Sequence, residues 1–378
     1  MKLNFFIGII FVLVATSNMA ISAVTVMTKT GTITVETVAE GLKSPWAIDF
    51  LPDGRMIFTE KMGNLRIVNK VGKISPAIMG TPKVANVGQG GLLDVMLHPE
   101  FRKNRLLFLT YSERSSEGRI YTAMLRGKLR LDDSQLDDVR VLFRQSPEVG
   151  SGRHLGSRVL IAPDGNLFVT TGDLGDRNLA QDLGGHVGKV IRLTVDGGVP
   201  EDNPFIKKPK TRPEIWSYGH RNIQGADIHP ETGKLWAIEH GPRGGDELNI
   251  ITAGGNYGWP LVSHGNEYSG EPIGAGKKFM KGIEPPINTW TPVIAPGGMT
   301  FYNSDLFPAW KGNLLIAGLR AGAVVRVELD GDKIVSEERL LNQIGNRIRD
   351  VEVGPDGAVY AVDESEGRIL RMTPALAN

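Results

Sequence analysis

The run Ala47-Ile48-Asp49-Phe50-Leu51-Pro52-Asp53-Gly54-Arg55-Met56-Ile57-Phe58 joins two short apolar segments through a Pro-Asp-Gly turn. Proline presets the backbone of a tight turn, and glycine accepts its left-handed position, so the run predicts a β-hairpin. Related runs return over Leu93 to Leu109, Ser157 to Thr170, Gln224 to Ile238, Met299 to Ala317 and Val351 to Val362. The chain therefore holds six copies of one hairpin unit.

The spacing of these units indicates how they are arranged. Successive turns are about 46, 65, 66, 78 and 48 residues apart, which suits four-stranded blades with unequal insertions. We therefore predict an all-β fold, a six-bladed β-propeller of four-stranded antiparallel blades. A two-sheet sandwich would explain neither the spacing nor six equivalent turns. Three units end in a short phrase of a glycine followed by apolar residues and an arginine, at Gly63 to Val68, Gly322 to Val327 and Gly367 to Met372, which we expect to form outer strands.

The first residues have the layout of a secretory signal peptide. Lys2 precedes the apolar run Phe5 to Val14, and small residues follow from Ala15 to Ala23. That run is shorter than the ~20 residues that cross a bilayer, so a cleaved leader is favoured over a retained anchor. We expect cleavage between Ala20 and Ala23, a single propeller catalytic domain over residues 24–378, and a soluble periplasmic product.

The amino-acid composition excludes several kinds of site and partner. There is no cysteine, so disulfides, thiolate metal sites and a cysteine nucleophile are excluded. Loss of Lys2 with the leader leaves 42 basic residues against 42 acidic ones. Because this balance gives no excess positive charge, nucleic acid is not expected as a partner.

Polar residues that do not fit strand alternation lie just before or after the repeated units. In a propeller such positions lie on one rim, so several arginines, one histidine and two amides would surround a single pocket. We expect that pocket to bind a multiply anionic ligand. The residues are Gln89, Arg153, His154, Arg221, Asn222, Asp246, Glu247, Arg320, Arg347 and Arg349.

Several longer motifs resemble those of the soluble quinoprotein sugar dehydrogenases, and most closely the aldose sugar dehydrogenases. They span nearly the whole mature chain in order. The resemblance implies pyrroloquinoline quinone (PQQ), Ca²⁺ and a six-bladed propeller. The motifs are Gln89 to Asp94, Trp216 to Gly225, Glu239 to Glu247, Gly255 to Pro260 and Asn346 to Asp350.

The resemblance also implies catalytic roles. His154 matches the general base that takes the proton of the sugar's anomeric hydroxyl while hydride passes to the quinone. Asp246 matches the carboxylate that orients this histidine, and Arg221 matches the residue over the reacting quinone carbonyl. These roles suit the residue types, because imidazole titrates near neutral pH and a guanidinium stabilises developing negative charge.

For the cofactor, Gln89 and Asn222 match contact residues, and Arg347 and Arg349 resemble the pair that binds its carboxylates. Arg320 falls where the family pattern commonly has lysine, a departure that puts the contact there in doubt.

For calcium, the resemblance implies an active-site ion held by the carbonyls of Gly241 and Pro242, and a structural ion near Glu247 and the backbone of Tyr257. Such oxygen ligands suit this hard cation. The alternative for Asp246 and Glu247 is an exposed acidic turn.

The sequence thus predicts oxidation of aldose mono- or oligosaccharides to lactones, with electrons passing to an unidentified acceptor, by a monomer or homodimer. A calcium-dependent lactone hydrolase and a non-catalytic binding propeller are the alternatives. The arginines disfavour the hydrolase, since they would repel a divalent ion without an intervening anion. Gly172 to Gly175 is too weak a match for a nucleotide-binding loop. Trp216, Trp259 and Trp290 either cover the cofactor or pack between blades, and packing is the favoured role.

Overall fold

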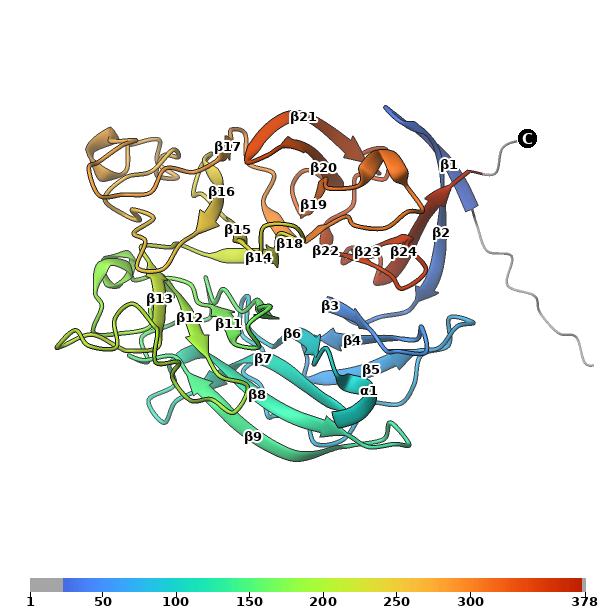
Figure 1. The fold of residues 1–378 in the computed structure, drawn as a ribbon, viewed down its shortest axis with the longest axis horizontal. Coiled ribbons are helices and arrows are strands. Elements are labelled where there is room, and N and C mark those ends of the chain that lie inside the picture. Colours follow the sequence, from blue (N-terminus) through green and yellow to red (C-terminus); the bar gives the residue numbers. More distant parts are fainter. Residues whose placement is uncertain (1–22, 376–378) are drawn as a thin grey trace, which may run out of the picture.

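The computed structural model describes residues 23–375, so the predicted leader lies almost entirely outside the described residues. Six antiparallel sheets surround a central axis, as Figure 1 shows in the view along that axis. The predicted six-bladed β-propeller is confirmed. No helix within residues 23–375 is long and apolar enough to cross a membrane.

The first five blades follow one another along the chain, each built from consecutive strands. The first contains β3 (Pro45–Phe50), β4 (Met56–Glu60) and β5 (Asn64–Val68), and the second contains β6 (Leu92–Leu97), β7 (Leu106–Arg114), β8 (Ile120–Leu129) and β9 (Leu136–Arg144). The third contains β10 (Val159–Ile161), β11 (Leu167–Thr170), β12 (Lys189–Leu193) and β13 (Ile215–Tyr218). The fourth contains β14 (Ile223–Ile228), β15 (Leu235–Glu239), β16 (Asp246–Ile251) and β17 (Asn288–Trp290). The fifth contains β18 (Pro296–Phe301), β19 (Leu314–Gly318), β20 (Ala323–Asp330) and β21 (Lys333–Leu340).

The sixth blade closes the ring. Its sheet has the order β1-β2-β24-β23-β22, so β1 (Ala23–Thr28) and β2 (Gly31–Glu40) join β22 (Ile348–Val353), β23 (Val359–Asp363) and β24 (Arg368–Pro374). β2 pairs antiparallel with β24 from Ile33–Pro374 to Glu40–Arg368. Backbone hydrogen bonds therefore hold together segments from opposite ends of the described chain.

Helical structure in the described residues is limited to short pieces: α1 (Phe101–Asn104) and 3₁₀ turns at Arg177–Gln181, Gly274–Gly276 and Pro308–Trp310. The six predicted hairpins are the first two strands of the six blades. The first strands β3, β6, β10, β14, β18 and β22 contact one another in sequence around the axis.

Two details of the blade prediction differ from the structure. The first blade has three strands plus a single bridge between Val68 and Ile74, and the closing blade has five strands. The phrases expected to form outer strands are β5, β20 and β24, each the third strand of its blade; β20 is covered by β21, and β24 by β2. A one-strand repeat phrase cannot show whether another strand will add outside it.

Aspartates on the inner strands tie neighbouring blades together. Asp49 Oδ2 accepts the backbone N–H of Leu97 at 2.6 Å, and Asp227 Oδ2 accepts that of Phe301 at 2.7 Å. Asp350 Oδ2 accepts the N–H of Ile48 at 3.0 Å, which links the last blade to the first. Because a carboxylate satisfies a buried donor that has no strand partner, these contacts fix how the blades meet.

Candidate functional site

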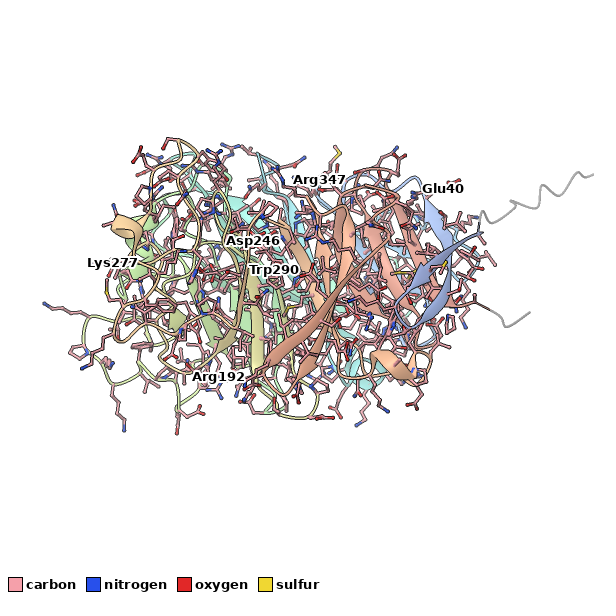
Figure 2. All side chains as sticks on the ribbon, turned by 90° about the horizontal axis from the view of Figure 1, so that it is seen from above. Glu40, Arg192, Asp246, Lys277, Trp290 and Arg347 are labelled. Atoms are coloured by element: carbon pink, nitrogen blue, oxygen red, sulfur yellow. The ribbon has the colours of Figure 1, made fainter. Side chains whose placement is uncertain are left out.

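The start of each inner strand and the end of the second strand lie side by side at one rim. Antiparallel pairing sets Ile223 opposite Glu239 in the fourth blade, and Ile348 opposite Asp363 in the sixth. The segments just outside these pairs, including Asn222 and Arg347, therefore meet around the axis. Figure 2, seen across the axis, places Arg347 toward one face and Arg192 toward the other.

A cavity of about 250 Å³ opens between these loops at the centre of the rim. It brings together residues of at least five blades, and most of its polar side chains come from the two loop sets just described. Its lining includes Trp46, Lys61, Gln89, Leu93, Leu155, Gly156, Asn222, Gln224, His240, Leu319, Arg347, Arg349 and Glu364. The predicted pocket with Gln89, Asn222, Arg347 and Arg349 is thus present as a cavity.

Positive charge is concentrated on one side of this cavity. Lys61, Arg347 and Arg349 line it, and burial together with the charges of the two arginines lowers the pKa of Lys61. Their one acidic neighbour among the lining residues is Glu364, which Arg347 contacts at 3.1 Å and Arg349 at 3.2 Å. Arg349 Nε is buried without a hydrogen-bond partner in residues 23–375. Three cations against one carboxylate form a site suited to an anion.

His154 is not itself a lining residue but lies at the edge of the cavity, next to the lining residues Gln89 and Leu155, in a strained backbone conformation. Its φ is 51°, and its N–H donates to Gln89 Oε1 at 2.6 Å. A Cβ on Gly172 would lie 1.9 Å from the His154 carbonyl, so only glycine permits this approach. Held in this way, the imidazole remains partly exposed, with 17% of the side chain accessible.

The carboxylate that binds His154 is Asp173, and the prediction of Asp246 in that role is wrong. Nδ1 of His154 lies 2.7 Å from Asp173 Oδ1. Asp173 follows β11, the second strand of the same blade, whereas Asp246 begins β16 of the next blade. Burial acts to raise the pKa of Asp173, but the hydrogen bond and charge of His154 hold it below its usual value.

Asp246 instead braces the loop that contains Gly241. Its Oδ1 accepts the N–H of Gly241 at 2.9 Å, and its Oδ2 accepts the N–H of Ala295 at 2.7 Å. Burial raises the pKa of Asp246 to about 6. The role of this carboxylate is therefore to fix the backbone that was predicted to supply calcium ligands.

Glu239 accepts hydrogen bonds from the backbone N–H groups of Arg221 and Asn222. Glu239 Oε2 accepts the N–H of Arg221 at 2.6 Å, while its Oε1 accepts His220 Nδ1 at 2.9 Å. The Arg221 guanidinium donates to the carbonyls of His240, at 3.1 Å, and Gly241, at 3.3 Å. Asn222 Oδ1 accepts the N–H of Gly156 at 3.1 Å. Glu239 thus fixes the backbone of both residues, while their side chains bind main-chain groups of neighbouring loops.

A second, smaller cavity of about 10 Å³ lies beside Arg221. It is lined by Gly241, Pro242, Glu247 and Tyr257, the four predicted calcium residues, and also by Glu239. Glu239 and Glu247 are paired directly across β15 and β16. Burial and the charge of Glu239 raise the pKa of Glu247 well above its usual value. Two carboxylates that face each other in so small a cavity suit a bound cation. Without a cation between them, their like charges would repel each other across the sheet.

One of the predicted cofactor contacts, Arg320, lies away from the cavity. Arg320 is exposed and is absent from the cavity lining, although Leu319 lines it; its contact with a cofactor stays a prediction.

His240 lines both cavities. Burial and the charges of Arg221 and Arg349 lower the pKa of His240 to about 3, and its Nε2 donates to the Pro296 carbonyl at 2.8 Å. It is therefore neutral.

Sequence reasoning missed Lys61, Asp173 and Glu364. Lys61 and Glu364 directly follow β4 and β23, and Asp173 follows β11 by three residues. Each lies where the second strand of a hairpin reaches the rim. The signal was available, because the hairpins were predicted and the residues after each second strand could have been examined blade by blade.

Comparisons with known proteins show the family to which this chain belongs. The family Glucose / Sorbosone dehydrogenase matches residues 42–371. Aldose sugar dehydrogenase YliI of Escherichia coli is 44% identical over 346 residues, covering 91% of this chain and 93% of that protein. The crystal structure of the soluble aldose sugar dehydrogenase from Escherichia coli in the apo-form has a TM-score of 0.89 at 44% identity, covering 91% of this chain and 100% of that one. The PQQ-bound aldose sugar dehydrogenase of Streptomyces coelicolor has a TM-score of 0.75 at 27% identity, covering 90% and 98%. This chain therefore belongs to the glucose/sorbosone dehydrogenase family of oxidoreductases.

Proposed function

We propose that this protein is a PQQ- and calcium-dependent aldose sugar dehydrogenase. It would oxidise the anomeric carbon of aldose mono- or oligosaccharides to a lactone and pass the electrons to an acceptor that is not yet identified. The observation that carries the proposal is the cation-lined cavity with the Asp173–His154 pair at its edge. Family membership and the PQQ-bound relative support it.

The residues present fit a tricarboxylate quinone. Lys61, Arg347 and Arg349 offer positive charge, and the unpaired Nε of Arg349 is a buried donor in need of an acceptor. Trp46, Leu93 and Leu155 supply apolar surface to the same cavity. These cations also argue against the lactone-hydrolase alternative, because a bare divalent ion would be repelled there.

Two side chains of this protein are suited to the chemistry. His154 would take the proton of the anomeric hydroxyl at Nε2, because Asp173 accepts Nδ1–H and so leaves Nε2 as the free base. Arg221 lines the smaller cavity and not the larger one; from there its positive charge would stabilise negative charge that develops in the reaction. When bound, PQQ supplies the hydride acceptor.

Calcium would bind at the carbonyls of Gly241 and Pro242 and, as a structural ion, near Glu247 and the Tyr257 backbone. The fit rests on the paired carboxylates of Glu239 and Glu247 in a cavity with room for one water-sized sphere. At the first site the Gly241 carbonyl accepts Arg221, so a metal there would share this oxygen with the guanidinium. Export to the periplasm and a single catalytic domain over residues 24–378 complete the proposal.

Dye-coupled oxidation of glucose and other aldoses by the purified mature protein tests this function, with PQQ and Ca²⁺ each added or withheld. We expect activity only with both. Absence of activity on every aldose, combined with no quinone binding in a titration, would overturn the proposal. If the protein binds the quinone but oxidises no aldose, the proposed substrate class is wrong, whereas the proposed cofactor stands.

A further inference from the structure

Trp259 connects the two sides of the candidate active site. Its indole Nε1–H donates to Asp173 Oδ2 at 2.9 Å, and this bond is buried, with Trp259 7% and Asp173 2% exposed. The guanidinium carbon of Arg221 lies 5.4 Å from the centroid of the Trp259 ring. One side chain therefore contacts both the carboxylate that binds His154 and Arg221, which lines the smaller cavity.

Asp173 depends on this contact for its orientation. Its Oδ1 accepts His154 Nδ1 and the N–H of Gly175, both at 2.7 Å, which leaves Oδ2 to Trp259. The Asp173 N–H donates to the Arg221 carbonyl at 2.8 Å. The Asp173 carboxylate is thus held at both oxygens. The hydrogen bond from Trp259 to Oδ2 fixes the rotation of the carboxylate, so that Oδ1 points at the imidazole.

Trp259 is itself firmly placed. Its N–H donates to the Gly219 carbonyl at 2.9 Å, and its carbonyl accepts Gln181 Nε2 at 2.8 Å. The Arg177 guanidinium lies 5.3 Å from the ring centroid and is paired with Glu267. Cation–π contact with two arginines favours one ring position. The indole N–H is therefore a fixed donor to Asp173.

We propose that Trp259 is a positioning residue, which sets the proton affinity of His154 through Asp173. This inference rests on the proposed function for its catalytic meaning, but not for its test. The indole N–H draws negative charge toward Oδ2 and away from the imidazole. Without it, Asp173 would stabilise the imidazolium more strongly, and His154 would be protonated at higher pH. The other charged or titratable groups that face the pair are Arg221, Arg177 and His240.

The test is an NMR titration of the His154 imidazole in ¹⁵N-histidine-labelled protein, without cofactor or sugar. His154→Asn assigns its signals among the seven histidines. In Trp259→Phe, which keeps an aromatic ring and removes the donor, we expect the His154 midpoint to rise by about one pH unit. An unchanged midpoint in a folded variant would overturn the proposal.

Trp290→Phe is the matched control. Trp290 is 6% exposed, and its Nε1–H donates to Glu337 Oε2 at 2.8 Å, so this change also removes an indole bond to a carboxylate. We expect it to leave the His154 midpoint where it is in the wild type. An equal shift in both variants would show a general effect of losing a tryptophan, and would refute the specific role of Trp259.

A measurement on the wild-type protein guards against a variant that fails to fold. The indole N–H signal of Trp259 should move with the same midpoint as the His154 imidazole, and Asp173→Asn should abolish this shared titration. An indole signal that is insensitive to His154 protonation would count against the proposal. If wild-type enzyme oxidises no aldose, the proposed function fails while these titrations still decide the role of Trp259.

With a working sugar assay, the pH profile adds a second readout. Trp259→Phe should lower kcat about tenfold at neutral pH, change KM less than about threefold, and move the acid limb of kcat/KM upward with the NMR midpoint. A raised KM with an unshifted limb would indicate a substrate contact instead.

Discussion

His154 Nδ1 lies 2.7 Å from Asp173 Oδ1, a hydrogen bond between a loop before the inner strand of the third blade and a loop after its second strand. The two residues are 19 positions apart and belong to one hairpin unit. A propeller can build a base and its orienting carboxylate within one blade, because the hairpin brings both ends to the same rim.

Asp173→Asn should lower kcat by about 10²–10⁴-fold, because an amide can hold the imidazole in the wrong tautomer and cannot stabilise the imidazolium. Steady-state kinetics with PQQ and Ca²⁺ measure it. Asp246→Asn is the comparison, since that carboxylate braces Gly241 and Ala295. A larger loss of kcat in Asp246→Asn, with His154 titration disturbed there alone, would contradict the pairing described above.

His154→Ala should cut turnover by about 10²–10⁴-fold and leave quinone binding largely intact, because the histidine lies at the cavity edge, outside the cation cluster. Single-turnover kinetics and a quinone titration separate the two effects. Loss of quinone binding instead would assign His154 to the cofactor site.

Arg349→Ala should weaken PQQ binding by about 10–100-fold, the loss expected for one or two charge-assisted hydrogen bonds. Quinone titration by fluorescence quenching measures it. Arg320→Ala decides the prediction for that residue: because Arg320 is exposed and off the cavity lining, we expect less than a threefold change. A loss as large as that of Arg349→Ala would place Arg320 in the site.

Glu247→Gln should abolish stabilisation by calcium. In the wild type, Ca²⁺ added to chelator-treated protein should raise Tm, since a ligand that binds only the folded state stabilises it. The variant removes one of the two paired carboxylates and their repulsion, so its Tm should respond little to Ca²⁺. Differential scanning calorimetry with and without chelator measures both, and an equal calcium response in variant and wild type would exclude Glu247 as a ligand.

Stability should fall as pH rises from about 4 to 6, in part through Asp227. Burial raises its pKa from 3.8 to about 6, so in this window the folded state binds more protons than the unfolded state. Asp227→Asn should flatten the dependence by about 1–3 kcal/mol. Urea unfolding at several pH values measures it, with the exposed Asp305→Asn as control. An unchanged slope in Asp227→Asn would mean that its carboxyl ionises normally.

The fold could be predicted because the hairpin signal is local. Pro-Asp-Gly and its variants specify a turn wherever they occur, and the six turns match the six observed hairpins. The number of outer strands could not be predicted, because it depends on pairing between distant segments such as β2 and β24. Nothing in either segment alone identifies its partner.

The same limit applies to the site. Gln89, Asn222, Arg347 and Arg349 were placed correctly at the cavity by their position beside the repeats. The assignment of Asp246 as the partner of His154 failed because motif likeness does not say which blade faces His154: Asp246 begins the third strand of the fourth blade, whereas Asp173 follows the second strand of the third blade. The observed pairing depends on the backbone at Gly172, whose lack of a side chain lets the two loops touch.

The closing sheet also determines when the binding cavity can come into existence. Arg347 and Arg349 lie at the start of β22, in the blade whose fourth strand is β2. A chain that emerges from synthesis or translocation with its N-terminal strands first can pair β2 with β1, but the other edge of β2 stays open until β24 arrives, more than 300 residues later. Only the pairing of β2 with β24 closes the ring of six blades. The topology therefore requires that the chain be complete before the cavity can bind any ligand.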